Sequence, residues 1–403
     1  MGSTPSSAGA AARAWRPALG AGVGAAASTL PPPLTVVTYN ILADKYATSG
    51  AHAYCPPQFL AWPYRKQRIL QQVLDFQADL LCLQEVERAF FEGELEPLLA
   101  EHGYEGLYAS RPRRPVDPPS VPEEGIGLLF RRERLERQAS RAVRFADVVP
   151  PALSGAKFWE AVKKREDGAL LALLRDRASG RSLLAGCTHL YYDPRFPDIK
   201  LAQSWLLCRA AVTFLRGQPA LGGLAPEQLA ARVPVILCGD FNSLAVKRRS
   251  DAFDTVPPGG ALVGGVYRLL AGEEVDPTHQ DHPARRSLGG GARGARDLST
   301  LLLGSRPLRL RSAAAAAWGR EPPLTNCTPS FRGCLDYCWL SQGHWAVREA
   351  LELPYRFDPA PPGAPAAVVD PEHVTDLPPL PDERHPSDHL PLGFRLTLLP
   401  PNA

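Results

Sequence analysis

The chain has 403 residues, of which 45% are apolar, and a net charge of +3 at neutral pH. This length and composition predict a soluble globular protein with a large core, in one large domain or two of ordinary size. No apolar run approaches the roughly 20 residues that span a bilayer, so no membrane partner is expected. The small net charge does not by itself predict nucleic-acid binding, although basic clusters at 110–115 and 246–250 are suited to contact phosphate.

Residues 1–33 contain no Asp or Glu, are rich in Ala, Gly, Ser and Pro, and carry only Arg13 and Arg16 as charged residues. This composition is typical of a disordered segment or of an organelle-targeting segment. Two arginines are few for a transit peptide, so both alternatives stay open.

From residue 34 the chain alternates apolar, strand-like runs with amphipathic helical stretches. We expect strands at residues 34–42, 78–86, 125–132, 168–176, 181–190 and 233–241. Helices are expected at 63–77 and 198–217, where apolar residues recur with the helical period. The inner stripe expected for the second helix is Leu201, Trp205, Leu206 and Ala210. The alternation predicts an α/β fold.

Two stretches rich in Gly or Pro, 285–296 and 357–383, lack apolar periodicity. Both are expected to be surface loops or insertions. They interrupt the domain without dividing it, so residues 34–400 are expected to form a single domain.

Eight cysteines in a chain of this length do not predict a disulfide framework. Cys82, Cys187 and Cys238 lie inside apolar runs, where a thiol behaves as a small core residue. Cys334 and Cys338 are four positions apart, but no second cluster at zinc-finger spacing accompanies them. The sequence therefore predicts a reducing, intracellular compartment, cytoplasm or nucleus, with organelle targeting by the N-terminal segment as the alternative.

The stretch CGDFNS (238–243) ends an apolar run with a carboxylate, Asp240, and an amide, Asn242. In a continuing strand, residues two apart point to the same face, so both side chains would share a site. The alternative is a plain turn, because Asp, Asn and Ser favour strand ends by bonding to nearby backbone. The rest of the chain decides between these two interpretations.

Carboxylates, amides and histidines close the other strand-like runs as well. The set comprises Asn40, Glu85, His189, Asp240, Asn242, Asp336, Asp388 and His389. A rigid sheet would fix the geometry of such groups, as a hydrolytic site that holds a metal and a phosphoryl group requires. Mg²⁺ prefers oxygen ligands and keeps several waters, so Glu85 and Asn40 can suffice as its protein ligands.

The ordered motifs TYN, QE, THL, GDFNS and SDH resemble the endonuclease/exonuclease/phosphatase superfamily over residues 34–398. Longer segments resemble the carbon catabolite repressor 4 type of deadenylase and its relatives nocturnin, Angel and the 2',5'-phosphodiesterase. They include YNILADKYAT, THLYYDPRFPDIKLAQ and LTNCTPSFRGCLDY. The resemblance implies a four-layer α/β/β/α sandwich, similar to deoxyribonuclease I, with the catalytic domain over residues 34–400.

The resemblance also implies how metal and charge are handled. Glu85 would hold Mg²⁺, for which Mn²⁺ can substitute, with Asn40 beside it and Asp388 reaching the metal site. Asp336 would pair with His389, so that His389 stabilises charge that develops on the phosphoryl group.

The remaining implied roles concern water and substrate. Asp240 would orient or deprotonate the attacking water, while Asn242 and His189 would bind phosphate oxygens. In deadenylases of this type an adenine lies against the positions that match Pro194, Asn326 and Phe331. An aromatic face and a directional amide are what base recognition needs.

The activity implied by the resemblance is a Mg²⁺-dependent 3'-5' exoribonuclease, specific for poly(A), that releases 5'-AMP by in-line attack of water. The alternative is a nocturnin-, Angel- or 2',5'-phosphodiesterase-like enzyme acting on a nucleotide or an oligoadenylate. An inactive RNA-binding module is disfavoured, because none of the polar strand ends is replaced. The expected partner is single-stranded RNA with a 3' poly(A) tail. Residues 1–33 cannot form leucine-rich repeats, so recruitment to a deadenylase complex through such repeats is not expected.

Overall fold

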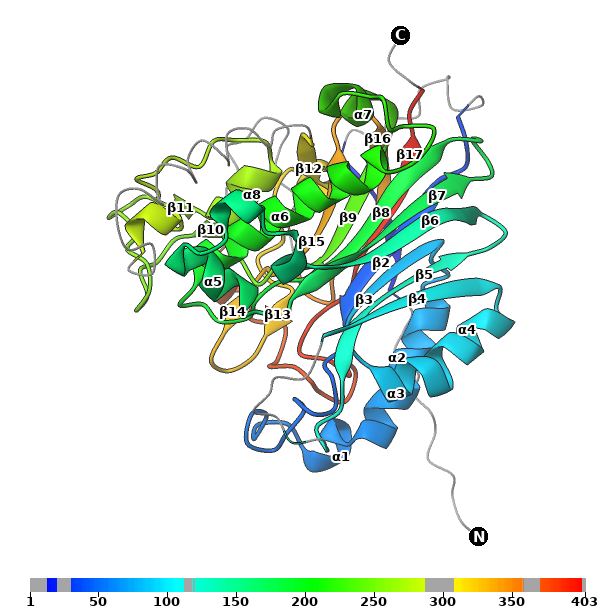
Figure 1. Cartoon of the computed structure of the whole chain (residues 1–403). Helices are drawn as coiled ribbons and strands as arrows, with labels where there is room; N and C mark the ends of the chain where they lie inside the picture. Colours follow the sequence, from blue (N-terminus) through cyan, green and yellow to red (C-terminus); the bar gives the residue numbers. More distant parts are fainter. Residues whose placement is uncertain are drawn as a thin grey trace.

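The computed structural model describes residues 13–19, 30–111, 118, 120–286, 308–356, 358 and 370–400. In this part of the chain, two mixed β-sheets pack face to face, and helices cover their outer faces (Figure 1). The four-layer α/β/β/α sandwich expected from the sequence is confirmed.

Among the described residues, the first sheet has seven strands, of which β2 and β3 form the parallel pair. Its order is β1 (Trp15–Pro17), β16 (Trp345–Leu351), β17 (Leu392–Leu398), β2 (Leu34–Asn40), β3 (Leu80–Glu87), β5 (Glu124–Arg131) and β4 (Tyr104–Arg111). The strand β17 thus lies inside the sheet, between β16 and β2.

The second sheet has six strands in the described part of the chain, and β8 and β9 form its parallel pair. Its order is β12 (Leu310–Ser312), β15 (Asp336–Ser341), β9 (Val235–Asp240), β8 (Ser182–His189), β7 (Gly168–Asp176) and β6 (Leu135–Arg144). Two short hairpins lie outside the sheets: β10 (Val246–Lys247) with β11 (Leu262–Val263), and β13 (Asn326–Cys327) with β14 (Arg332–Gly333).

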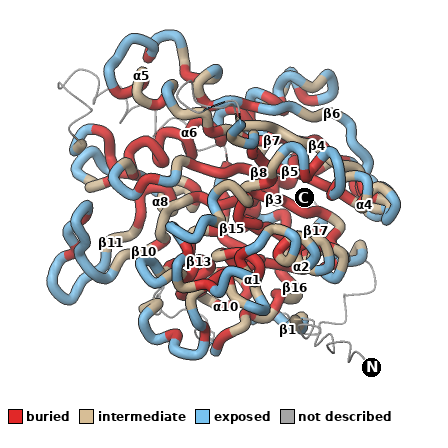
Figure 2. Tube along the Cα trace, turned by 90° about the horizontal axis from the view of Figure 1, so that it is seen from below, coloured by how far each residue is buried: buried red, intermediate tan, exposed pale blue. Residues whose placement is uncertain are grey.

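The central strands are buried on both faces. In β3, Leu80 and Cys82 face the second sheet, whereas Leu81 and Leu83 face the helices. In β9, Cys238 likewise belongs to the layer between the sheets. Successive side chains point to opposite faces, and both faces are buried, so these strands are continuous apolar runs in the sequence. Figure 2 shows the buried segments gathered in the interior and the exposed segments in the outer loops.

The helices form the two outer layers. The first sheet is covered by α1 (Pro57–Leu60), α2 (Trp62–Asp75), α3 (Arg88–Phe90), a π-helical turn (Phe91–Leu95) and α4 (Glu96–Glu101). The second is covered by α5 (Lys157–Lys163), α6 (Pro197–Arg216), α7 (Pro226–Arg232) and α8 (Gly265–Leu270). A further helix, α10 (Ala313–Trp318), packs beside β15 and β16. Short 3₁₀ turns occur at Phe145–Val148, Pro151–Leu153, Pro283–Arg285 and Pro371–His373.

The helix α6 begins and ends within one residue of the expected bounds. Its expected inner stripe of four residues is too narrow, because nearly the whole helix is buried. The reason is that α5, α7 and α8 pack against it from outside.

The N-terminal segment differs in part from the expectation of disorder over residues 1–33. Trp15–Pro17 forms β1, which pairs antiparallel with β16. The Arg13 guanidinium donates to the carbonyl of Glu352 at 2.5 Å, and the ring of Trp15 packs under Arg395. Edge pairing therefore orders residues 13–19, while most of the segment lies outside the described residues. Residues 287–296 of the first expected insertion and 357 and 359–369 of the second also lie outside them.

All eight cysteines are buried and free. Among the described residues, none of the helices has both the length and the apolar character that a bilayer crossing demands.

Gly239 provides a test of the pairing between β8 and β9. Its φ is +154°, and a Cβ there would lie 2.0 Å from the carbonyl oxygen of Thr188 on the neighbouring strand. We expect Gly239→Ala to lower the free energy of unfolding by about 3 kcal/mol or more. Urea unfolding followed by tryptophan fluorescence measures this.

The matched control is Gly223→Ala, because a Cβ at Gly223 meets no atom within 4 Å. The control should change the free energy of unfolding by less than about 1 kcal/mol. Equal effects of the two substitutions would contradict the strand contact.

Candidate active site

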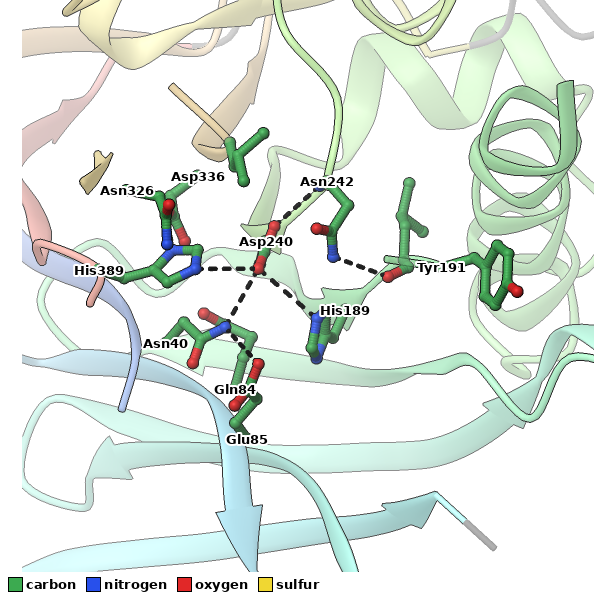
Figure 3. A network of polar contacts seen from close by, with 12 residues as sticks. Asn40, Gln84, Glu85, His189, Tyr191, Asp240, Asn242, Asn326, Asp336 and His389 are labelled. Carbon is green, nitrogen blue, oxygen red and sulfur yellow. Dashed lines mark hydrogen bonds and ion pairs between the residues drawn. The ribbon is translucent and has the colours of Figure 1, made fainter. Parts of the chain in front are cut away.

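Strand register brings the polar strand ends of both sheets to one place. In the second sheet, β8 places His189 opposite Asp240, and β15 places Asp336 on the other side of Asp240. In the first sheet, Asn40 at the end of β2 pairs with Gln84 of β3. Figure 3 shows that further side chains converge there, namely those of Glu85, Asn242, Asn326 and His389.

The carboxylate of Asp240, which is 1% exposed, is the centre of this group. Its Oδ2 accepts a hydrogen bond of 3.1 Å from Asn40 Nδ2 and lies 3.5 Å from His189 Nε2 and 3.7 Å from His389 Nε2. Its Oδ1 accepts the backbone N–H of Asn242 at 2.8 Å. Burial raises the pKa of Asp240 to about 7, because the charge of His389 offsets only part of the desolvation. A carboxylate with this pKa can take up and release a proton near neutral pH.

The imidazole of His389 is oriented by Asp336. Its Nδ1–H donates to Asp336 Oδ2 at 2.8 Å, and both residues are buried. Burial alone would lower the pKa of His389, but the charges of Asp336 and Asp240 raise it well above its usual value. His389 is therefore a cation whose Nε2 lies beside the Asp240 carboxylate and can donate to an oxygen bound there.

His189, on another side of Asp240, is in the opposite protonation state. Burial, together with the positive charges of Arg111 and His389, lowers the pKa of His189 well below its usual value. The Arg111 guanidinium is itself held by Glu124 at 3.1 Å and by Asp167 at 2.9 Å. The site thus contains one neutral and one charged histidine.

Glu85 and Asn40 are joined directly. Asn40 Nδ2 donates to Glu85 Oε1 at 3.0 Å, and the other carboxylate oxygen of Glu85 accepts from the backbone N–H of Ala43 at 3.1 Å. Asn40 Oδ1 accepts the backbone N–H of Leu42 at 3.0 Å, which fixes the orientation of the amide. The amide nitrogen therefore faces Glu85 and Asp240. The amide oxygen has a second lone pair besides the one that accepts from Leu42, so the metal-ligand role of Asn40 stays a prediction.

Asp388 lies beside the group, near the end of the loop that leads into β17. Asn326 Nδ2 donates to Asp388 Oδ2 at 3.1 Å, and His52 Nε2 lies 4.0 Å from the same oxygen. The second oxygen, Oδ1, is buried without a hydrogen-bond partner among the described residues. Burial and the charge of Asp388 raise the pKa of Glu85 from 4.5 to about 6.

These carboxylates fit a hard divalent cation. Glu85 and Asp388 repel each other, and the buried oxygen of Asp388 that lacks a partner is a ligand type that Mg²⁺ prefers. Ligand atoms of Asp240, Asp336 and His389 also lie within 4.8 Å of one another. A protonated imidazole has no free lone pair for a metal, so the oxygens of Glu85 and Asp388 are the better donor set.

Two side chains tie the loop after β2 to the loop before β17. The Arg65 guanidinium is fully buried and donates to the carbonyls of Leu42 at 2.9 Å and Pro386 at 3.0 Å. Ser387 Oγ donates to the carbonyl of Asn40 at 2.7 Å. Asn40 and His389, far apart in the sequence, are therefore held by the same local network.

Sequence reasoning did not identify Arg65 as part of the site. It lies on the buried face of α2 with Ile69 and Val73, and these three positions are four residues apart. An arginine in such a stripe must find several acceptors in the interior, and this spacing was the signal that could have revealed it.

Three site residues have left-handed backbone conformations: Leu42, Glu85 and Asn242 have φ values of 57°, 56° and 47°. Such conformations are rare outside glycine and are found where a functional geometry is over-determined by its surroundings. Leu42 and Asn242 follow the ends of β2 and β9, whereas Glu85 lies inside β3, where the register with β5 shifts between Leu83 and Val86.

The three positions expected to contact adenine are placed differently from one another. Asn326 lies within the group, and its amide oxygen accepts no hydrogen bond from a described residue. Phe331 is 37% exposed in the turn between β13 and β14, and Pro194 is exposed in the loop after β8. Among the described residues, no hydrogen bond or ring contact joins Pro194 or Phe331 to the group around Asp240, although the Phe331 ring lies beside Gly333, which pairs with Asn326.

The raised pKa of Glu85 predicts that its charge destabilises the metal-free protein. The shift from 4.5 to about 6 corresponds to about 2 kcal/mol at pH 7.5, where the carboxylate is ionised. Glu85→Gln removes the charge but sacrifices one of two hydrogen bonds, at about 1 kcal/mol. In EDTA, we expect Glu85→Gln to raise the free energy of unfolding by about 1 kcal/mol at pH 7.5. This gain should vanish as the pH falls to 4.5, where wild-type Glu85 is protonated in the folded state.

Urea unfolding at the two pH values checks this expectation. Glu87→Gln, in the same strand, is the control. Burial also raises the pKa of Glu87, but the backbone N–H and the charge of Lys45 offset part of this rise, so a smaller gain is expected. A loss of stability for Glu85→Gln at pH 7.5 would show that the charge is compensated in the folded protein.

Comparison with known proteins shows which family and which proteins the chain is similar to. A sequence model of the endonuclease/exonuclease/phosphatase family matches residues 37–389. The chain is similar to the CCR4-Not complex 3'-5'-exoribonuclease subunit Ccr4 of Saccharomyces cerevisiae, with 30% identity over 92% of this chain and 39% of that protein. It is 28% identical to Ccr4 of Candida glabrata over 91% of this chain and 37% of that protein. The chain thus spans well under half the length of these two curated relatives.

Solved structures show the same architecture. A crystal structure of ANGEL2, a 2',3'-cyclic phosphatase, superposes with a TM-score of 0.65 at 22% identity, covering 97% of this chain and 99% of that one. The catalytic domain of human Nocturnin superposes with a TM-score of 0.56 at 24% identity, covering 92% and 96%. At these identities the likeness establishes the fold alone.

Proposed function

The chain belongs to the endonuclease/exonuclease/phosphatase family, and from this membership we propose that it is a divalent-metal-dependent 3'-5' exoribonuclease that shortens poly(A). The similarity to Ccr4 subunits along most of this chain supports the reaction class. The observation that carries the proposal is a buried carboxylate with a pKa of about 7, placed between a neutral and a cationic histidine. Eight buried, free cysteines support an intracellular location.

We assign the proton transfer to Asp240, which can orient a water and accept its proton near neutral pH. His389, held as a cation by Asp336, donates its Nε2–H to the phosphoryl oxygens as negative charge develops. Neutral His189 completes the oxyanion contacts. Opposite environments thus give opposite protonation states to two histidines around one carboxylate.

The remaining polar groups hold the phosphate and the metal. Asn242 uses one N–H on the carbonyl of Leu190 at 3.0 Å, which leaves its second N–H for a phosphate oxygen. Glu85 and Asp388 would hold the cation, which when bound neutralises charge on the phosphate. Asn40 positions Glu85 and Asp240 through its amide nitrogen.

Base recognition involves Asn326 and Phe331. The amide nitrogen of Asn326 is engaged by Asp388, so its oxygen is the group left to accept the amino group of adenine. Uracil has no amino group to offer, and cytosine presents a smaller face to the Phe331 ring. The preference for adenine therefore rests on the amide oxygen and on the stacking area together.

The first test measures trimming of 5'-labelled RNAs that end in A20, C20 or U20, with purified protein and Mg²⁺. We expect A20 to be shortened fastest with release of 5'-AMP, and Asp240→Asn to abolish trimming. NADPH, a 2',5'-linked oligoadenylate and a 2',3'-cyclic phosphate run in parallel. Rapid turnover of one of these with A20 left intact would replace the proposal with the phosphatase or phosphodiesterase alternative.

The second test separates the two determinants of base preference. Asn326→Ala should reduce the preference for A20 over U20 about tenfold, since it removes one directional hydrogen bond next to the base. Phe331→Ala should weaken binding to all three tails, because stacking contributes about 1–3 kcal/mol per base and tolerates any base. Identical selectivity in Asn326→Ala and wild type would remove this amide from base recognition.

A further inference from the structure

An arginine is stacked on aromatic rings beside the loop that follows His189. The guanidinium of Arg165 lies 4.4 Å from the ring centroid of Tyr191 and 5.4 Å from that of Phe196. The rings of Tyr191 and Tyr192 are in contact, with centroids 5.1 Å apart. We call these four side chains, Arg165, Tyr191, Tyr192 and Phe196, the aromatic–arginine patch.

Tyr192 presents an open ring to solvent. It is 61% exposed, more than any other large apolar side chain in the described part of the protein. Aromatic rings of this kind contribute most when a planar partner covers them, and nucleobases are such partners. The ring therefore offers a stacking surface that the fold itself does not use.

Arg165 is not paired directly with a carboxylate of the described residues, although its charge acts on Asp167. It forms no ion pair with a described residue, and its Nε is buried without a hydrogen-bond partner among them. Asp167, two positions further on, is already engaged by Arg111 at 2.9 Å and by Gln203 at 2.7 Å. Glu166 is engaged by Arg144 at 2.8 Å. With its faces on two rings, the guanidinium keeps its N–H edge for an anion.

The neighbouring Arg195 differs in this respect. It forms a bidentate pair with Asp193, with N–O distances of 3.0 and 2.6 Å. Its charge is therefore neutralised within the loop, and Arg165 is the arginine of this region that is suited to bind phosphate.

The patch adjoins the catalytic group. The backbone N–H of Leu190 donates to the carbonyl of Asp240 at 2.9 Å, and the carbonyl of Leu190 accepts from Asn242 Nδ2 at 3.0 Å. Tyr192 follows two residues later, within about 7 Å along the chain. In Figure 3 the ring of Tyr191 lies on the side of Asn242 that faces away from Asp240.

Building on the proposed function, we propose that the aromatic–arginine patch binds the nucleotide next to the terminal one in single-stranded RNA. The base stacks on Tyr192, and a backbone phosphate pairs with the N–H edge of Arg165. This combination of an aromatic platform and a cation is the usual means of binding single strands without reading their sequence. The patch thus determines affinity for a strand, while the terminal pocket determines which base is removed.

The test compares two substrates that share the terminal adenosine and the scissile phosphate. One is A20 RNA; the other is the 4-nitrophenyl ester of 5'-AMP, in which nitrophenol replaces the upstream nucleotide. Tyr192→Leu should raise the KM for A20 about tenfold, with kcat little changed, and leave the KM for the ester within twofold. Tyr192→Trp should restore the wild-type KM, because it restores a planar face.

Arg165→Ala should also raise the KM for A20. The affinity for A20 should fall less steeply with salt, with the slope of log affinity against log salt smaller in magnitude by about 0.7, which corresponds to the loss of one phosphate contact. Arg209→Ala is the matched control. Its guanidinium is likewise stacked on a ring, that of Trp205 at 4.8 Å, but it lies about 18 Å along α6 from the end nearest the patch. It should leave both substrates unaffected.

Equal changes in KM for the two substrates, or no change for either, would contradict the RNA-binding role of the patch. Either result would leave the exoribonuclease proposal intact. A second measurement tests whether the patch binds RNA even if the protein does not trim it: binding of labelled A20 in EDTA, followed by fluorescence anisotropy. If wild type binds A20 without trimming it and Tyr192→Leu weakens that binding, the patch stands and the exoribonuclease proposal falls.

Discussion

The structure depends on keeping one carboxylate, that of Asp240, buried where two sheets meet. Removing a carboxylate from water costs several kcal/mol, so the fold must supply donors and a compensating charge at fixed positions. It does so with the backbone of Asn242, the amide of Asn40 and the cation of His389. These partners come from three separate segments, so the registers of both sheets must be correct at once. The dry layer between the sheets, which includes Cys82 and Cys238, supplies the required rigidity.

The same constraint explains the irregular parts of the site. Asn242 follows the end of β9, where its left-handed backbone turns the chain. The left-handed backbone of Glu85 coincides with the register shift inside β3, so neither side chain follows the regular pleat. Arg65 offsets part of the cost, because its guanidinium holds the carbonyl of Leu42, the third residue in this conformation. A buried arginine with backbone acceptors is a rigid connection, and its ion-pair partner at 3.5 Å is Asp44, outside the group around Asp240.

Much of the fold could be predicted from the sequence, because each central strand is a bounded apolar run that ends in a polar residue of the site. The convergence of Asn40, His189 and Asp240 follows from that pattern and from strand register. The orientation of the Asn40 amide could not be predicted, since it is decided by one backbone N–H, that of Leu42. The strand β1 was missed because the Ala- and Gly-rich composition around it indicates disorder, whereas pairing with the edge of β16 overrides local preference. The roles assigned to Pro194 and Phe331 rest on resemblance, and the geometry leaves them on separate loops.

The central position of β17 has a consequence for folding during synthesis. This strand is close to the C-terminus, yet it fills the gap between β16 and β2, and the loop before it carries His389. While the ribosome is still synthesising the chain, β2 has an open edge and the Asp240 carboxylate lacks its cation. An open edge of this kind invites pairing with other chains, so the nascent protein needs protection until β17 has emerged and paired. The group around Asp240 is therefore assembled only when β17 closes the first sheet and brings His389 to it.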